Sequence, residues 1–144
     1  MKKIYLIIAI TLFTSCSVKK KEIEYLQFEH RCIIKRKSDQ VLVSILPFPK
    51  NKRLVETNHQ NKATTKFIGE KEYYKIVDDI LKIKKEQKDS TIVFTDGSIN
   101  TITYRKGSEI KTFTSEKLSK EYPSFYYAVK SILESAGIYI DNIR

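Results

Sequence analysis

The sequence EIEYLQFEHRCIIKR at residues 22–36 is the first indication of the fold class, because apolar and polar side chains alternate along it. Successive side chains of an extended chain point to opposite faces, so this alternation gathers the apolar residues on one side. A period of two predicts a β-strand with one face buried and the other near water. The expected apolar face consists of Leu26, Phe28, Cys32 and Ile34, and the charged face of Glu29, Arg31 and Lys35.

A second strand is expected after a polar turn at residues 37–40. Residues 41–46 are rich in β-branched side chains, which favour strands. Pro47 is expected to end this strand, because proline cannot donate a hydrogen bond to a β-ladder. The two strands together predict an antiparallel hairpin.

Residues 47–62 are predicted to form a long irregular loop, because they contain Pro47, Pro49 and many basic and amide side chains. Loops longer than about 12–15 residues are uncommon in compact domains and are often functional. This segment is therefore the first candidate for a contact surface. The alternative is a flexible connector that leads to a short strand at residues 64–68. The candidate contact residues are Lys50, Lys52, Arg53, His59 and Lys62.

Two amphipathic helices are predicted, over residues 70–84 and 123–136, because apolar residues recur there at helical spacing. Gly137 suits the end of the second helix, and the isoleucines after it suggest a tail packed back on the domain. Tyr74 and Tyr127 fall outside the apolar stripes, so we expect them to be exposed and available to a protein or glycan. Partial burial at the margin between helix and sheet is the alternative.

Three more strands are expected, at residues 91–95, 99–105 and 109–114, and Asp96-Gly97 is a strong hairpin signal between the first two. The whole pattern predicts a single α+β domain: an antiparallel sheet of five or six strands with both helices on one face. Residues 66–71 are similar to residues 112–117, and each segment leads toward a helix. This similarity suggests two β-β-(β)-α repeats, although amphipathic helices also resemble one another without any repeat.

The N-terminus has the pattern of a secretory signal peptide. Lys2 and Lys3 precede a ten-residue apolar run at residues 4–13 that only Thr11 interrupts, and Thr14 and Ser15 are small residues directly before Cys16. A membrane-spanning helix needs about 20 apolar residues, roughly twice this length. The segment is therefore predicted to direct export and to be removed.

This segment, which ends in Thr14-Ser15-Cys16, resembles a bacterial lipoprotein signal with its lipobox, although Phe13 stands where leucine is usual. The resemblance implies cleavage after residues 1–15, acylation of Cys16 with palmitate-like chains, a tether at residues 16–21 and a domain at residues 22–144. The whole chain is loosely similar to small lipoproteins of Gram-negative envelopes. That similarity implies attachment to the inner or outer membrane, with the domain in the periplasm or at the cell surface. An ordinary signal and a soluble periplasmic protein are the alternative.

The positive net charge of the chain favours acidic partners. Without Lys2 and Lys3 the chain keeps 25 basic and 17 acidic residues, a net charge of +8. Nucleic acid is not expected as a partner, because of the export signal and because no nucleic-acid-binding motif is present. Anionic lipids, lipopolysaccharide, acidic glycans or an acidic protein fit this charge. A merely soluble, lysine-rich surface is the alternative.

The sequence does not indicate an enzyme or a cofactor. It contains no nucleophile elbow, phosphate-binding glycine loop or zinc-protease motif. Two histidines and one remaining thiol are too few for a convincing metal site. His30 and Cys32 continue an apolar stripe, so catalysis there is not expected, and Asp78-Asp79 is predicted to be a solvated helix face.

The leading hypothesis is therefore a membrane-tethered, non-catalytic module that binds a protein or an anionic envelope component. Either the uncovered sheet face or the expected loop would supply the contact. An inhibitor or immunity-type lipoprotein that blocks a periplasmic hydrolase or toxin is the alternative. A small envelope hydrolase with unrecognised carboxylates is a third and weaker hypothesis.

Overall fold

The structure is a computed structural model that describes residues 22–32, 40–83 and 98–143. The predicted signal peptide with Cys16, most of the turn at residues 37–40, the strand at 91–95 and the Asp96-Gly97 hairpin lie outside the described residues.

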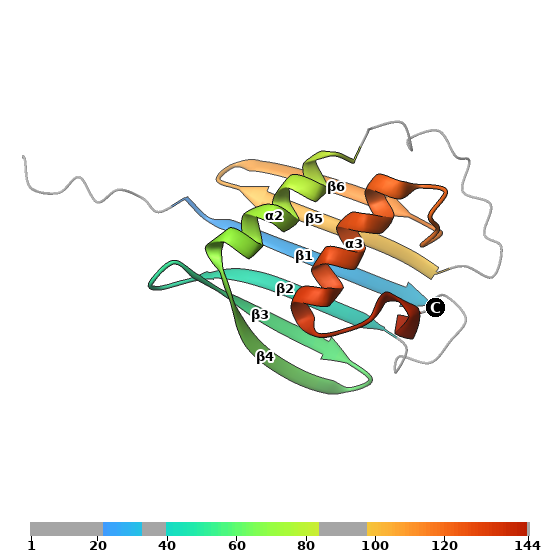
Figure 1. The fold of residues 1–144 in the computed structure, drawn as a ribbon, viewed down its shortest axis with the longest axis horizontal. Helices are drawn as coiled ribbons and strands as arrows, with labels where there is room; N and C mark the ends of the chain where they lie inside the picture. Colours follow the sequence, from blue (N-terminus) through green and yellow to red (C-terminus); the bar gives the residue numbers. More distant parts are fainter. Residues whose placement is uncertain (1–21, 33–39, 84–97, 144) are drawn as a thin grey trace, which may run out of the picture.

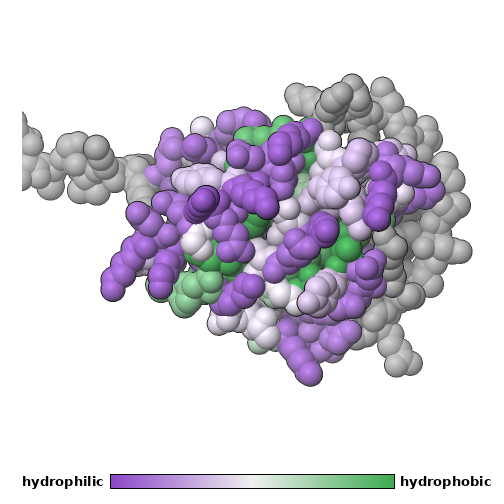
Figure 2. Space-filling view, in the orientation of Figure 1, coloured by the Kyte–Doolittle hydropathy of each residue, from purple (hydrophilic) through white to green (hydrophobic). Residues whose placement is uncertain are grey.

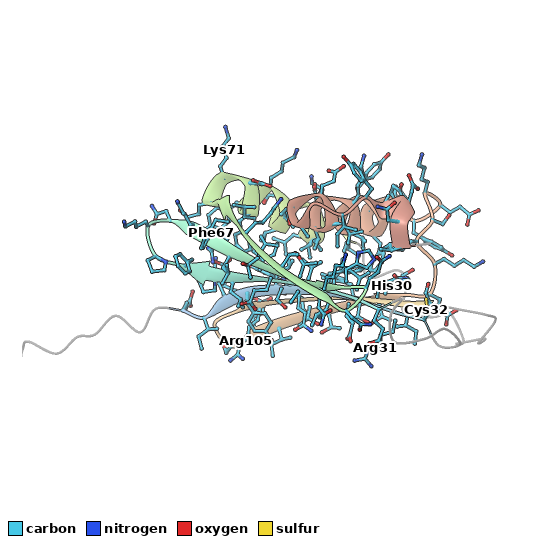
Figure 3. The ribbon with its side chains drawn as sticks, turned by 90° about the horizontal axis from the view of Figure 1, so that it is seen from below. His30, Arg31, Cys32, Phe67, Lys71 and Arg105 are labelled. Carbon is cyan, nitrogen blue, oxygen red and sulfur yellow. The ribbon has the colours of Figure 1, made fainter. Side chains whose placement is uncertain are left out.

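The described residues form one antiparallel sheet whose six strands follow the order β4-β3-β2-β1-β5-β6. Helices α2 (Glu70–Leu81) and α3 (Pro123–Ala136) both lie on the same face of this sheet (Figures 1 and 3). This arrangement confirms the predicted α+β class. The strands are β1 (Glu24–Cys32), β2 (Val41–Phe48), β3 (Lys52–His59), β4 (Lys62–Gly69), β5 (Ser98–Lys106) and β6 (Glu109–Ser115).

The core lies between the sheet and the two helices, and the period-two pattern of the strands explains why. Leu26 and Phe28 of β1 and Ile102 of β5 are fully buried, and the residues between them along β1 are not. From the helix side, Ile80 of α2 and Ile132 of α3 are likewise fully buried. The helices therefore cover one face of the sheet, and no other described helix or strand covers the opposite face.

The predicted loop at residues 47–62 is wrong, because most of this segment belongs to strands β2, β3 and β4. Two tight turns join these strands, and both use left-handed backbone at residues other than glycine. Lys50 and Asn51 have φ of 62° and 55° between β2 and β3, and Gln60 and Asn61 have φ of 52° and 60° between β3 and β4. Two-residue hairpin turns favour positive φ and usually carry Asn-Gly or Asp-Gly, so Gln60-Asn61 was not recognised as one.

The prediction that Pro47 ends β2 is also wrong, since β2 continues through Phe48. The paired residues of β1 and β2 end at Leu26 and Ile45. Pro47 lies beyond this pair, where its missing N–H removes no hydrogen bond from the β1–β2 ladder.

Helix α3 has the predicted bounds, and Gly137 ends it in the left-handed conformation with φ of 76°. After it, a short 3-10 helix, η3 (Ile140–Ile143), packs on the domain, and Ile138, Ile140 and Ile143 are buried as predicted. Helix α2 ends at Leu81, three residues before the predicted end, and Leu81 is exposed instead of continuing the apolar stripe.

The proposed repeat does not match the number of strands. Four strands precede α2, whereas two or three were expected. The two similar segments do correspond in one respect: they lie in and just after β4 and β6, which are the two edges of the sheet.

Candidate functional site

The five candidate contact residues do not form one surface. Lys50 and Lys52 are exposed at the turn between β2 and β3, whereas His59 and Lys62 flank the turn at the other end of β3. His59 is seven positions after Lys52 along an extended strand, a distance of about 23 Å. Arg53 is buried, so it is not available as a contact residue.

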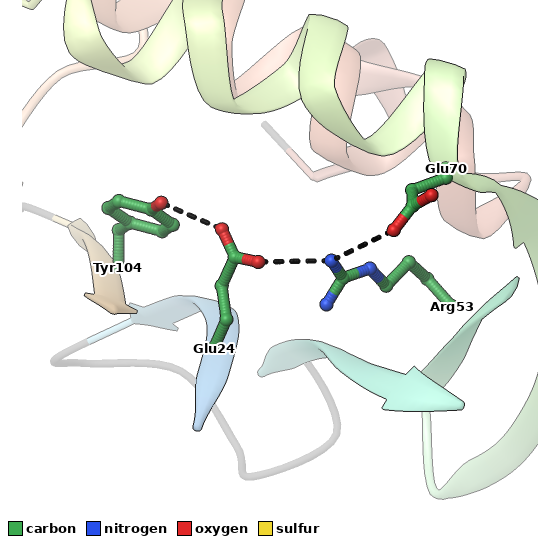
Figure 4. Close-up of polar contacts among 4 residues, drawn as sticks. All are labelled: Glu24, Arg53, Glu70 and Tyr104. Atoms are coloured by element: carbon green, nitrogen blue, oxygen red, sulfur yellow. Dashed lines mark hydrogen bonds and ion pairs between the residues drawn. The ribbon is translucent and has the colours of Figure 1, made fainter. Parts of the chain in front are cut away.

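Arg53 instead belongs to a buried polar cluster beneath α2 (Figure 4). Its guanidinium donates to Oε2 of Glu24 at 3.0 Å, and Oε1 of Glu70 lies 3.8 Å away. The hydroxyl of Tyr104 donates to Oε1 of Glu24 at 2.9 Å. The guanidinium carbon also lies 4.0 Å from the centre of the Tyr73 ring, so the cluster connects β1, β3, β5 and α2.

The electrostatics of this cluster keep its tyrosines protonated. Burial raises the pKa of Tyr73, and the nearby Glu24 carboxylate raises it further. Burial also raises the pKa of Tyr104, together with the hydrogen bond that its hydroxyl donates to Glu24. Buried charges are stable only when they are paired and hydrogen-bonded, and Arg53 and Glu24 satisfy each other. We interpret the role of this cluster as structural: it holds β1, β3, β5 and α2 together.

No described helix or strand covers the face of the sheet opposite the helices, which we call the open face, and Arg31 and Arg105 point away from the helices on this side (Figure 3). One end of the open face is apolar. Phe48 and Phe67 are 40% and 52% exposed, and their ring centroids are 4.7 Å apart. The ammonium of Lys52 lies 5.9 Å from the centroid of the Phe67 ring. We call this group the aromatic end; its members are Leu46, Phe48, Lys52, Leu54 and Phe67.

Strand register assembles the aromatic end from residues distant in sequence. Leu54 of β3 is paired with Leu46 of β2 on one side and with Phe67 of β4 on the other. Across the sheet, exposed Ile110 of β6 is paired with Arg105 of β5 at the same end. The adjacent cross-strand row is polar and consists of Gln27, Ser44, Glu56, Thr65, Thr103 and Thr112. The exposed aromatic side chains of the open face therefore gather at one end, and exposed Leu42 of β2 lies apart from them toward the other end.

Tyr74 and Tyr127 are exposed, as predicted, on α2 and α3 respectively. Each packs edge-on against the buried tyrosine that precedes it, Tyr73 or Tyr126. The surrounding surface of the helix layer is mainly hydrophilic (Figure 2). Each exposed tyrosine thus contacts a buried ring, whereas Phe48 and Phe67 are two exposed rings in contact with each other.

Asp78 is exposed, as predicted, but Asp79 is not part of a solvated face. Its carboxylate accepts hydrogen bonds from Ser131 of α3 and from Lys82, both at 2.9 Å. Burial alone would raise the pKa of Asp79, but these hydrogen bonds and the charge of Lys82 outweigh it and lower the pKa. Asp79 therefore joins the two helices.

A second polar group lies near the end of β1. Nε2 of His30 is 3.4 Å from Sγ of Cys32, and Nδ1 of His30 is 2.7 Å from Oδ1 of Asn100 on β5. His30 and Asn100 are buried, and Cys32 is partly exposed. The sequence indicated that Cys32 and His30 are neighbours, but it did not indicate Asn100, which the register of β1 and β5 places opposite His30.

Within the described ranges, no three His, Cys, Asp or Glu side chains are grouped as a metal site requires. No helix in the same part of the chain has the length and apolar character of a membrane span. Comparison with models of known protein families and with curated protein sequences found no match.

Proposed function

We propose that this chain is a membrane-anchored lipoprotein of a Gram-negative envelope that acts as a non-catalytic binding module. Acylated Cys16 is the anchor, and residues 16–21 form the tether. The domain lies in the periplasm or at the cell surface and binds a protein or an anionic envelope component. The proposal concerning the anchor rests on the N-terminal sequence pattern, in which an apolar run and two small residues precede the cysteine.

The aromatic end carries the binding part of the proposal. A sheet that is covered on one face only usually turns polar side chains to water on the other face. Here Phe48 and Phe67 are in contact with each other and remain substantially exposed. Grouped exposed apolar side chains often mark an interaction site, whereas scattered ones do not.

The chemistry of the buried polar groups is consistent with a non-catalytic module. Glu24 and Arg53 neutralise each other, and Asp79 is held by Lys82 and Ser131. These groups hold strands and helices together, so the buried Glu24 and Arg53 and the half-buried Asp79 all have structural partners.

Site-specific photocrosslinking in intact cells tests this function. A photoreactive amino acid replaces Phe67 in the full chain, and the matched control places it at Tyr127, which is similarly exposed on the helix side. We expect a defined adduct with an envelope component at position 67 and none at position 127. A single adduct with a hydrolase or toxin would identify the inhibitor-type module. Equal or absent adducts at the two positions would contradict a binding role for the aromatic end.

A further inference from the structure

We propose that the aromatic end lies against the anionic lipid surface of the membrane that carries the anchor. This inference rests on the proposed function, because it requires acylation of Cys16, and it names the occupant of the same surface. In this orientation the aromatic end faces the bilayer, and the opposite end of the sheet, where Arg31 lies, points away from the bilayer.

The length of the tether places this end of the domain near the bilayer. Glu22, where the described fold begins, is six positions after Cys16 in the sequence. Even a fully extended chain spans no more than about 3.6 Å per residue, so the fold begins within roughly 22 Å of the anchor.

The first described residues lie at the same end of the sheet as the aromatic end. The N–H of Gly107, in the turn between β5 and β6, donates to the carbonyl of Ile23 at 2.8 Å. Arg105, just before this turn, is in register with Tyr25 near the start of β1. β2 ends at Phe48 and β4 at Gly69, and because both run antiparallel to their neighbours, these ends lie beside the start of β1 and β3. A short tether therefore brings this end, rather than the Arg31 end, to the membrane.

The side chains at this end have the composition of a membrane-interface contact. Phe48 and Phe67 are exposed on the open face, and Ile23 and Ile110 are more than half exposed beside the β5–β6 turn. Aromatic and aliphatic side chains of this kind enter the boundary between headgroups and acyl chains when a protein lies on a bilayer.

Basic residues surround these apolar side chains. Lys50, Lys52, Arg105 and Lys106 lie at the two turns of this end, together with the acidic Glu22 and Glu109. The excess is positive, and Lys19, Lys20 and Lys21 of the tether add to it. Lysine and arginine near a bilayer are attracted to anionic headgroups, so the charge complements an anionic surface.

The size of the surface favours lipid over a protein partner. The aromatic end has five members, whereas a standard protein interface contains about 20–30 residues on each side. The adjacent row of the open face is polar. A small apolar group bordered by basic residues is suited to a shallow contact with the lipid surface that adds to the acyl anchor.

Tryptophan fluorescence in vesicles tests this orientation, because the sequence contains no tryptophan. The full acylated chain carries a single tryptophan at Phe67 or, as the control, at Arg31. The burial patterns of β1 and β4 place both residues on the open face, and Figure 3 shows them at opposite ends of the sheet. Each protein is reconstituted into phosphatidylglycerol-containing vesicles whose acyl chains carry bromine, which quenches nearby tryptophan. Flotation of the vesicles measures anchoring separately.

We expect Phe67→Trp to lose most of its emission in brominated vesicles, and Arg31→Trp to keep its emission. Adding Lys50→Glu and Lys52→Glu should restore much of the lost emission without reducing flotation. Equal emission at the two positions in floating protein would overturn the orientation and leave the anchor intact. A protein adduct at position 67 in cells, with no quenching in vesicles, would also overturn it. Absence of flotation would overturn the anchor and, with it, this inference.

Discussion

The imidazole of His30 lies 2.7 Å from the side-chain oxygen of Asn100, and the direction of the hydrogen bond between them is determined by a third group. The amide nitrogen of Asn100 donates to the carbonyl of Ser115 at 3.1 Å. A carbonyl can only accept, so this bond turns the amide oxygen of Asn100 toward His30. Nδ1 of His30 must then carry the hydrogen, and in the neutral imidazole Nε2 is left to accept from the thiol of Cys32.

Replacement of Asn100 by alanine should destabilise the domain by about 2–4 kcal/mol, because it leaves Nδ1 of His30 and the carbonyl of Ser115 buried without these partners. Urea denaturation of the full chain measures the change in the free energy of unfolding, and Asn58→Ala on the open face is the control. Nitrogen NMR should show that Nδ1 of His30 is protonated in the wild type. Protonation of Nε2 alone would contradict the bond directions derived above.

Breaking the buried ion pair between Arg53 and Glu24 should strongly reduce the free energy of unfolding. Arg53→Met leaves the Glu24 carboxylate without its cation, and loss of one partner of a buried pair typically costs about 3–5 kcal/mol. The matched control is Arg31→Met, which breaks an exposed Arg–Glu pair with Glu29 and should change stability little. Similar free energies of unfolding for the two variants would show that the Arg53 pair is not effectively buried.

Removal of the hydroxyl group should affect the stability of the domain differently at the two buried tyrosines. Within the described residues, the buried hydroxyl of Tyr73 has no hydrogen-bond partner, so Tyr73→Phe should leave stability unchanged or raise it. Tyr104→Phe removes a hydrogen bond to the Glu24 carboxylate and should cost about 1.5–3 kcal/mol. Equal destabilisation in urea would refute the difference assigned to these hydroxyls.

Alkaline pH should destabilise the fold through the same tyrosines. Burial raises the pKa of both Tyr73 and Tyr104 above the ordinary value of about 10. Below pH 10 the folded and unfolded chains both keep these protons. Above about pH 10 the unfolded chain releases them while the folded chain retains them, so stability falls as pH rises.

The free energy of unfolding, measured from pH 8 to pH 11, tests this predicted loss of stability. The decrease should be smaller in Tyr73→Phe and Tyr104→Phe than in the wild type. Lysines that titrate in this range are common to all three proteins, so the differences between them isolate the tyrosines. An equal decrease in all three proteins would mean that the two tyrosines do not contribute to it.

Hydrophobic periodicity predicted most of the fold, because the buried faces of β1, β5, α2 and α3 are continuous in sequence. It failed for β3, where polar Asn58 and His59 follow a short apolar core, and for β4, which is exposed along almost its whole length. An edge strand that buries one side chain, Ile68, carries little alternation. The turn at Gln60-Asn61 lacked the glycine that usually marks a hairpin.

The candidate site was less predictable, because it depends on strand register. Nothing local to Phe48 or Phe67 indicates that their rings meet, since 18 residues separate them in the sequence. Arg53 was taken for a loop cation for the same reason. Its partner, Glu24, lies 29 residues earlier in the chain and comes close only because the sheet places β1 and β3 on either side of β2.

The mass of the N-terminal peptide of the protein, purified from its own membranes, is the decisive test of the lipid anchor. We expect a chain that begins at Cys16 and carries a diacylglyceryl group on the sulfur. Cys16→Ser should abolish this species and release the protein from the membrane fraction. A chain that begins after Cys16, or an unmodified Cys16 in a freely soluble protein, would show that the chain is not a lipoprotein.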